Sequence, residues 1–254
     1  MKCLTRILTG LIWISGILSL LADDVPIAPI LLETSSNDHQ AYQLTSKHLS
    51  LQVSPEKGGI VVLNAPGEEN FLSSPITFKI SEDEKNEIWE SRAWRTNEGK
   101  QVVMLKKNIM SPQPLRIVHF IELSTTGEKL IQSTRITSLG PGDQHLLRPL
   151  YQIALRAPDE EMSIENQTNL SYAENQLLIK TSWEIEDPEI RLAEVKKIVP
   201  LENSLVCETS PPSELELPPQ GWSLLAKIEF QLSDIDISAT QPESELQRLD
   251  ISQP

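Results

Sequence analysis

The sequence predicts an all-β protein, a large antiparallel β-sandwich of about a dozen strands at the usual lengths of strands and turns. Several segments alternate between apolar and polar residues, most regularly residues 115–123 and 221–232. Such alternation is typical of a strand with one face in a core and the other in water. Turn residues such as Gly99 and Gly140-Pro141-Gly142 separate these segments. Short alternating segments between turns are the pattern of an antiparallel sandwich.

The expected strands follow one another along most of the chain. In order they cover residues 48–53, 60–63, 75–81, 88–94, 100–106, 115–123, 129–139, 146–157, 171–183, 204–209 and 221–232. Segments 88–94 and 100–106 form an expected hairpin, because the turn between them contains Gly99. Residues 189–198 fit a helix face almost as well as a bent strand. The hydrophobic content of 39% is enough for a substantial core.

Residues 54–72 combine two turns with an apolar run. Gly58-Gly59 precedes the run 60–63, and Pro66-Gly67 follows it. Glycine adopts positive φ or lets another backbone approach closely. The β-branched run suits a strand covered on both faces, and Pro-Gly is a turn signal. We therefore expect a β-turn-β unit here.

The first 22 residues have the features of a secretory signal peptide. Lys2 and Arg6 form a positive region, residues 7–21 are apolar with small interruptions, and Ala22 precedes two aspartates. The run is short for a membrane-spanning helix, which needs ~20 residues. We expect an exported protein, periplasmic or secreted; an uncleaved N-terminal anchor is the alternative, because Leu20 is a poor residue three positions before the cleavage site.

The predicted organisation of the chain has four parts. They are a signal peptide (1–22), a linker rich in proline, serine and acidic residues (23–38), the β-sandwich domain (39–232) and a disordered acidic tail (233–254). No second apolar run is long enough to span a membrane. We therefore expect no contact with a membrane beyond the signal peptide.

Charge and cysteine content limit the partners and the compartment. The formal net charge is −14. We do not expect nucleic-acid binding, because phosphate backbones repel an acidic protein. Cys207 alone remains after the leader is removed, so no internal disulfide forms and the core must hold the fold. Cys207 alternates within residues 204–209 and is expected to be a buried strand residue. The absence of disulfides in an exported domain of this size favours a periplasmic location.

The pattern around the glycine pair resembles a known family. Residues 54–72 read Ser-Pro-Glu-Lys-Gly-Gly-Ile, then Leu63, Gly67, Asn70 and Leu72. With the strand at 204–209, the segment Leu-Pro-Pro-Gln-Gly at 217–221 and the long last strand, this is similar to the galactose-mutarotase-like (aldose 1-epimerase-like) β-supersandwich domains. The resemblance covers residues 42–232 and implies a carbohydrate-related function. Relatives often carry arginine where this chain has Ile60, and their Asn-x-x-His segment is not found, so the resemblance implies the fold more than the reaction.

Two histidines are the candidates for catalysis if the protein is an aldose epimerase. That reaction needs an acid and a base, and histidine serves near neutral pH. His119 and His145 have the most suitable placement of the four histidines. His119 shares its strand phase with apolar residues, however, which favours a core position, and His145 follows a turn, which favours a solvated one.

The richest local cluster for ligand binding contains Trp89, Arg92, Trp94 and Arg95. Aromatic faces stack on sugar C–H surfaces, and arginine holds hydroxyls or carboxylates. Within a strand, Arg92 and Trp94 share one face, while Trp89 and Arg95 lie on the other. The alternative is structural, with Trp89 in the core and the arginines in salt bridges.

Metal and cofactor sites are not expected. No histidine or cysteine spacing typical of zinc occurs, and no nucleotide-binding fingerprint is present. Acidic clusters at residues 82–84, 159–161 and 184–189 lack calcium-loop spacing and are expected to be solvated loops.

Three hypotheses of function remain. The first is an exported carbohydrate-binding protein without strong catalytic activity, the second a divergent aldose epimerase using His119 and His145, and the third an envelope interaction or assembly module with no small-molecule site. Protein partners and the particular sugar are not predicted.

Overall fold

The structure is a computed structural model. It describes residues 41–80, 89–109, 114–139, 145–147, 149–164, 167–172, 175–186, 189–192, 194–211, 215–217 and 223–234. The predicted signal peptide and linker lie outside the described residues, and so does the predicted tail from residue 235 onward. Within the described part of the chain, no helix is long and apolar enough to cross a membrane.

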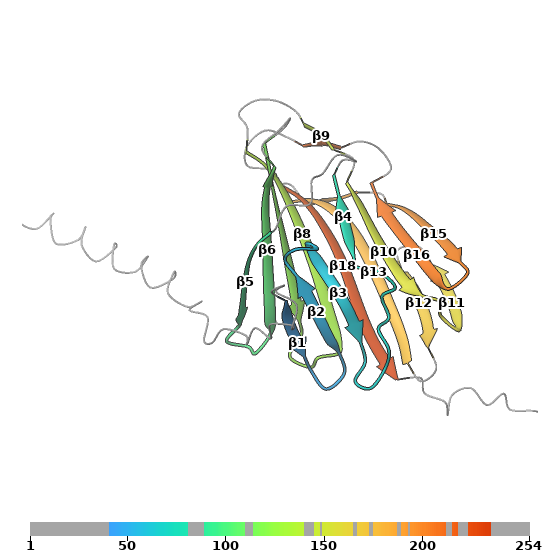
Figure 1. Cartoon of the computed structure of the whole chain (residues 1–254). Helices are drawn as coiled ribbons and strands as arrows, with labels where there is room; N and C mark the ends of the chain where they lie inside the picture. The colour runs from blue at the N-terminus through green and yellow to red at the C-terminus, as the bar shows by residue number, and fades with distance from the viewer. Residues whose placement is uncertain are drawn as a thin grey trace, which may run out of the picture.

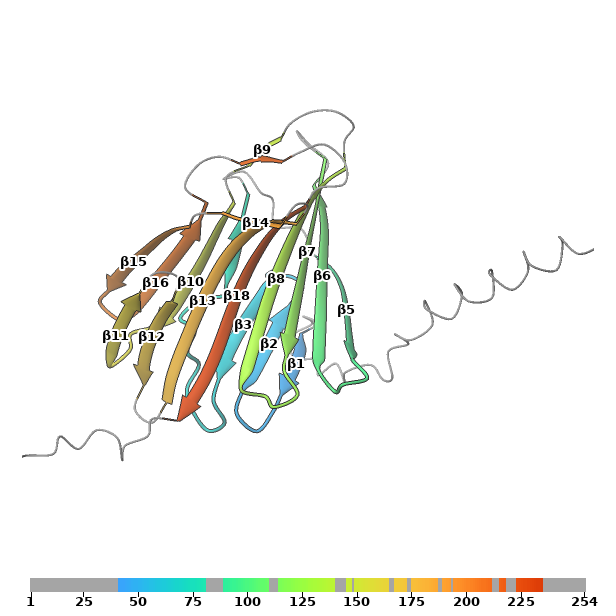
Figure 2. The same cartoon turned by 180° about the vertical axis from the view of Figure 1, so that it is seen from behind.

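The all-β prediction is confirmed: the described residues form eighteen strands in antiparallel sheets that pack as two layers (Figure 1). The larger layer is a nine-stranded sheet, seen in front in Figure 2. Its strands, in spatial order, are β11 (Glu160–Ile164), β12 (Gln167–Tyr172), β13 (Asn175–Glu186), β18 (Ser223–Asp234), β8 (Lys129–Ser138), β7 (Leu115–Leu123), β6 (Gln101–Ile109) and β5 (Glu90–Arg95), with β14 (Glu189–Arg191) paired to β13.

The second layer consists of two smaller sheets, and a strand pair lies at one end of the sandwich (Figures 1 and 2). The three-stranded sheet contains β1 (Tyr42–Thr45), β2 (Ser50–Ser54) and β3 (Gly59–Asn64); the four-stranded sheet contains β15 (Val195–Leu201), β16 (Ser204–Ser210), β10 (Leu150–Arg156) and β4 (Thr77–Lys79); the end pair is β17 (Leu215–Leu217) and β9 (His145–Leu147).

One hydrophobic core fills the space between the layers. The inward residues of both layers belong to a single cluster, and its largest fully buried side chains include Trp183, Tyr151, Phe71 and Phe230. β7 illustrates the origin of this core, because its alternate residues from Leu115 to Leu123 are buried, as the alternation predicts. The opposite residues of the same strand face outward and are available for a site.

The glycine pair serves both uses that were expected of it. Gly58 has a φ of 69°, which residues with a β-carbon rarely adopt. A β-carbon at Gly59 would lie 2.9 Å from the carbonyl oxygen of Ile76. The backbone of Ile76 therefore approaches closely, and its N–H donates to the carbonyl of Ile60 at 2.9 Å. In the strand that follows, Leu63 is fully buried but Val61 is half-buried, so the expected cover on both faces is incomplete.

Several boundaries predicted from the sequence are wrong. The expected strand 171–183 is the hairpin β12–β13, in which Tyr172 pairs with Asn175. The expected strand 146–157 is divided between β9 and β10, and residues 160–161 of an expected acidic loop belong to edge strand β11. The ambiguous segment 189–198 contains strand β14 and the beginning of strand β15.

The predicted hairpin and the buried cysteine are confirmed. β5 pairs with β6 in an antiparallel register from Glu90–Lys106 to Arg95–Gln101. Cys207 is a buried free thiol on β16, and burial raises its pKa to about 11.

Candidate functional site

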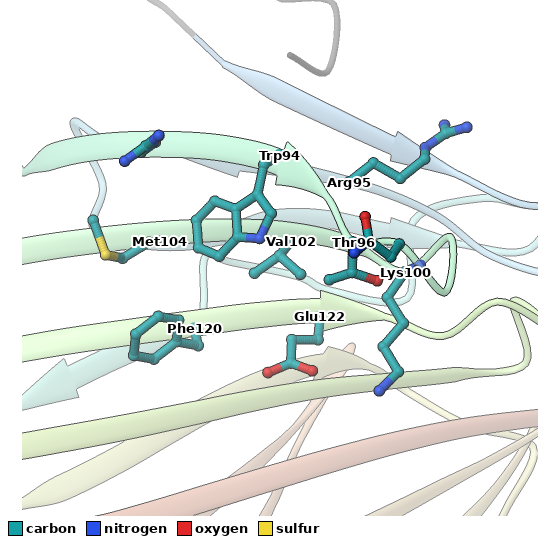
Figure 3. Close-up of a pocket in the computed structure, with 10 residues that line it drawn as sticks. Trp94, Arg95, Thr96, Lys100, Val102, Met104, Phe120 and Glu122 are labelled. Carbon is teal, nitrogen blue, oxygen red and sulfur yellow. Dashed lines mark hydrogen bonds between the residues drawn. The ribbon is translucent and has the colours of Figure 1, made fainter. Parts of the chain in front are cut away.

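A pocket of about 450 Å³ opens on the face of strands β5, β6 and β7 that points away from the core (Figure 3). We call it the outer-face pocket. It is lined by Arg92, Trp94, Arg95, Thr96, Asn97, Lys100, Val102, Met104, Phe120 and Glu122.

The strand register brings the lining residues together in two rows. Trp94 lies opposite Val102, and Val102 lies opposite Glu122. The neighbouring row is Arg92, Met104 and Phe120. Directly opposed residues share a face of the sheet. Their neighbours Val103 and Ile121 point into the core and are fully buried, so both rows lie on the outer face.

The pocket has an apolar floor and an aromatic wall. Val102 is 3% exposed although it lies on the outer face, because the surrounding side chains cover it. Figure 3 shows the Trp94 indole beside Val102, with Met104 and Phe120 at one end of the pocket. Trp94 and Phe120 are half-buried, so part of each ring is free to contact a ligand. Apolar walls with a few polar groups are typical of small-molecule sites.

One lysine and one carboxylate lie at the other end of the pocket. The Lys100 ammonium and the Glu122 carboxylate lie on the same side in Figure 3. Lys100 is 3.0 Å from Glu98, and this hydrogen bond and ion pair raise the pKa of Lys100, with a smaller contribution from Glu122. The Thr96 hydroxyl accepts a hydrogen bond from the Lys100 N–H at 3.1 Å and so helps to hold the turn that carries Lys100.

Comparison with known structures identifies the fold. Slr1438 from Synechocystis sp. PCC 6803 is 12% identical and has a TM-score of 0.56 over 80% of this chain and 99% of its own. The candidate mutarotase YeaD from Salmonella typhimurium is 6% identical, with a TM-score of 0.56 over 87% of this chain and 99% of its own. A galactose mutarotase related enzyme from Lactobacillus acidophilus is 8% identical, with a TM-score of 0.50 over 76% of this chain and 97% of its own. The fold is galactose-mutarotase-like.

This finding confirms the resemblance inferred from the glycine pair, and at these identities it concerns the galactose-mutarotase-like fold alone. No protein-family model matches the chain. No curated protein matches it either.

The structure divides the four predicted ligand-binding residues. Arg92, Trp94 and Arg95 line the outer-face pocket. The Arg95 side chain points away from Trp94 (Figure 3), as its opposite strand phase requires. Trp89 lies in the core on the other face, where its ring is 4.5 Å from that of His119. Trp89 therefore supports the galactose-mutarotase-like fold from inside and does not line the pocket.

Seven lining residues were not predicted as site residues. Thr96, Asn97 and Lys100 lie between β5 and β6, and the other four are Val102, Met104, Phe120 and Glu122. These four are the outward members of two strands whose alternation was recognised. Their presence beside Trp94 follows from the pairing of β5, β6 and β7. The outward Phe120 in an otherwise regular strand was the available signal.

His119 is fully buried between the two layers. Its Nδ1 is hydrogen-bonded to Thr134 Oγ1 at 2.5 Å, and Thr134 is hydrogen-bonded to the Tyr151 hydroxyl. Burial lowers the pKa of His119 to about 3 and raises that of Tyr151. A histidine with no exposed surface cannot exchange a proton with a ligand in the outer-face pocket. The side chain of His145 lies outside the described part of the structure.

Metal binding gains no support from the described side chains. Among them, no three histidine, cysteine, aspartate or glutamate residues are grouped so that they could hold a metal ion.

Proposed function

We propose that the protein is an exported carbohydrate-binding protein and that the outer-face pocket is its sugar site. The observation that carries the proposal is the half-buried Trp94 indole beside the apolar Val102, with charged and polar side chains around it, on a galactose-mutarotase-like sheet. An aromatic ring with a polar rim suits a sugar, which has apolar C–H faces and hydroxyl edges.

The lining residues match these two properties of a sugar. Trp94 and Phe120 offer ring faces for stacking. The Glu122 carboxylate can accept hydrogen bonds from hydroxyls, and the Asn97 amide can donate to them or accept from them. The volume of about 450 Å³ is within the range of small-molecule sites, roughly 300–1,000 Å³. The pocket is therefore large enough for a sugar.

We propose binding without strong catalysis. Exchange between anomers needs a general acid and a general base within reach of the sugar. The lining residues include one carboxylate, Glu122, and no histidine. The placement of His119 in the core also argues against its role in an epimerase.

Export is proposed from the leader sequence, residues 1–22. Expression of the full chain in a bacterial host, followed by mass determination of the product, tests it. Cleavage after Ala22 is expected. A product that still contains Met1 and is found in the membrane fraction would favour the uncleaved anchor.

A thermal-shift screen of residues 23–254 against neutral and acidic sugars tests the binding proposal. A ligand at 100 times its dissociation constant adds about 2.7 kcal/mol of stability, which is visible as a rise in melting temperature. The rise should be lost in Trp94→Ala and kept in Val118→Ala. Val118 lies on the same outer face of the sheet, on β7, but does not line the pocket. If no sugar raises the melting temperature, the interaction-module hypothesis becomes the better one.

A further inference from the structure

We propose that the sugar bound in the outer-face pocket carries an oxyanion, a carboxylate or a sulfate, and that Arg92 binds this group. This inference rests on the proposed function and specifies its ligand class. The whole chain has a net charge of −14, whereas the lining residues contain three cations and one carboxylate.

The ion pairs of the region leave the arginines as the free cations. Lys100 is occupied by Glu98 at 3.0 Å. Glu90, two residues before Arg92 on the same face, is occupied by Lys106 at 2.6 Å. The carboxylate nearest in sequence to Arg92 is therefore already neutralised by another residue.

A comparison of the arginines supports the same conclusion. Arg116 donates to Asn108, Arg156 pairs with Glu69, and Arg135 has an interaction of its own. Arg92 and Arg95 have no hydrogen bond or ion pair with any residue that the structure describes. Among the arginines whose side chains are described, the two without such a partner are the two that line the pocket.

Arg92 is the better placed of these two arginines. It shares a face with Trp94 and stands in the row of Met104 and Phe120. Arg95 has the opposite phase, and its side chain points away from Trp94 (Figure 3). A sugar stacked on Trp94 would thus have one unpaired guanidinium beside it.

The single carboxylate among the lining residues determines how the sugar is oriented in the pocket. Glu122 lies two strands from Arg92 and one row further along, at least roughly 10 Å away at the usual strand spacing. Glu122 repels an oxyanion and accepts hydrogen bonds from hydroxyls. The oxyanion therefore points toward Arg92 and the hydroxyl edge of the sugar toward Glu122.

The chemistry of arginine fits this role. Its planar fork donates two parallel hydrogen bonds to a carboxylate or a similar oxyanion, and lysine does not reproduce this geometry. A charge-assisted hydrogen bond contributes enough for about a tenfold or greater preference in affinity. An acidic protein otherwise repels anions, so the preference must come from local contacts.

Isothermal titration of residues 23–254 with galactose, galacturonate and galactose 6-sulfate tests the inference. We expect at least one acidic sugar to bind about tenfold more tightly than galactose, and the stronger of the two acids identifies the oxyanion. Arg92→Ala should remove the preference, so that this variant binds the acidic sugar and galactose with about equal affinity. Arg92→Lys should keep only part of the preference. Arg116 is an exposed arginine on the face of β7 that carries Phe120 and Glu122, and Arg116→Ala should keep the whole preference.

The outcomes separate this inference from the proposed function. Equal affinity for galactose and both acids would overturn the oxyanion inference and leave sugar binding in place. A preference that survives in Arg92→Ala would overturn the role of Arg92. Absence of binding by all three sugars, in a protein that unfolds cooperatively, would count against both proposals.

Discussion

The indole of Trp89 occupies the space in which a β-carbon at Gly58 would lie, with the indole nitrogen only 2.2 Å from that position. Gly58 also has a positive φ of 69°. The turn before β3 and the core beneath β5 therefore depend on each other. The Trp89 ring also packs against that of His119, with 4.5 Å between the ring centroids.

Gly58→Ala should destabilise the protein strongly. The left-handed conformation costs a residue with a β-carbon about 1–2 kcal/mol, and the clash with Trp89 adds the cost of moving a buried indole. Gly67→Ala is the matched control, because Gly67 has a φ of 85° but no atom within 4 Å of its β-carbon position. Urea unfolding should show a clearly larger loss for Gly58→Ala; equal losses would mean that Trp89 moves freely.

His119 should make the stability depend on pH below neutrality. Burial lowers its pKa from 6.5 to about 3, so between these values the unfolded chain takes up a proton that the folded protein does not. His119 therefore leaves the free energy of unfolding unchanged above pH 6.5. As the pH decreases from 6.5 toward 3, it lowers this free energy by up to about 1.4 kcal/mol per pH unit.

The measurement is the difference in unfolding free energy between the wild type and His119→Asn from pH 7.5 to 5. The other histidines and the carboxylates are common to both proteins and cancel in the difference. The wild type should lose more stability than the variant over this range. Parallel curves would show that His119 titrates normally.

The thiol of Cys207 should be unreactive in the folded protein. It is buried, and its pKa is raised to about 11 by burial, so little thiolate forms at pH 8. The chain from residue 23 has no other cysteine. Reaction with an aromatic disulfide reagent should be slow in buffer and fast in denaturant, and rapid stoichiometric labelling of the native protein would be inconsistent with this position.

Thr209→Val should destabilise the protein by about 1–3 kcal/mol. The Thr209 hydroxyl accepts a hydrogen bond from the Trp183 indole N–H at 3.0 Å and donates one to Glu194. The variant keeps the shape of the side chain and leaves the buried N–H without this acceptor. Thr126→Val, at an exposed hydroxyl, is the control and should change the unfolding free energy little. Equal effects of the two substitutions would show that the hydrogen bonds of Thr209 do not stabilise the protein.

Much of the fold could be predicted because alternation and turn glycines act locally. β7 has the same boundaries as its predicted segment, and β18 extends through residue 234 where residue 232 was expected. The hairpin β12–β13 was missed because the chain reverses between Tyr172 and Asn175 with neither glycine nor proline to mark it.

The candidate site was predictable only along one strand. Alternation places Arg92 and Trp94 on one face and Trp89 on the other, and the structure has this arrangement. Phe120 and Glu122 join the pocket through the pairing of β5 with β6 and of β6 with β7. That register arises from contacts distant in sequence and could not be read from either strand alone.

The most direct test of the sugar site follows the indole N–H resonances of ¹⁵N-labelled residues 23–254 during titration with the best-binding sugar. The Trp94 resonance should shift with the occupancy of the site, while those of the buried Trp89 and Trp183 should stay in place. Single substitutions of each tryptophan by phenylalanine assign the resonances. Saturable sugar binding that leaves the Trp94 resonance unchanged would contradict the account.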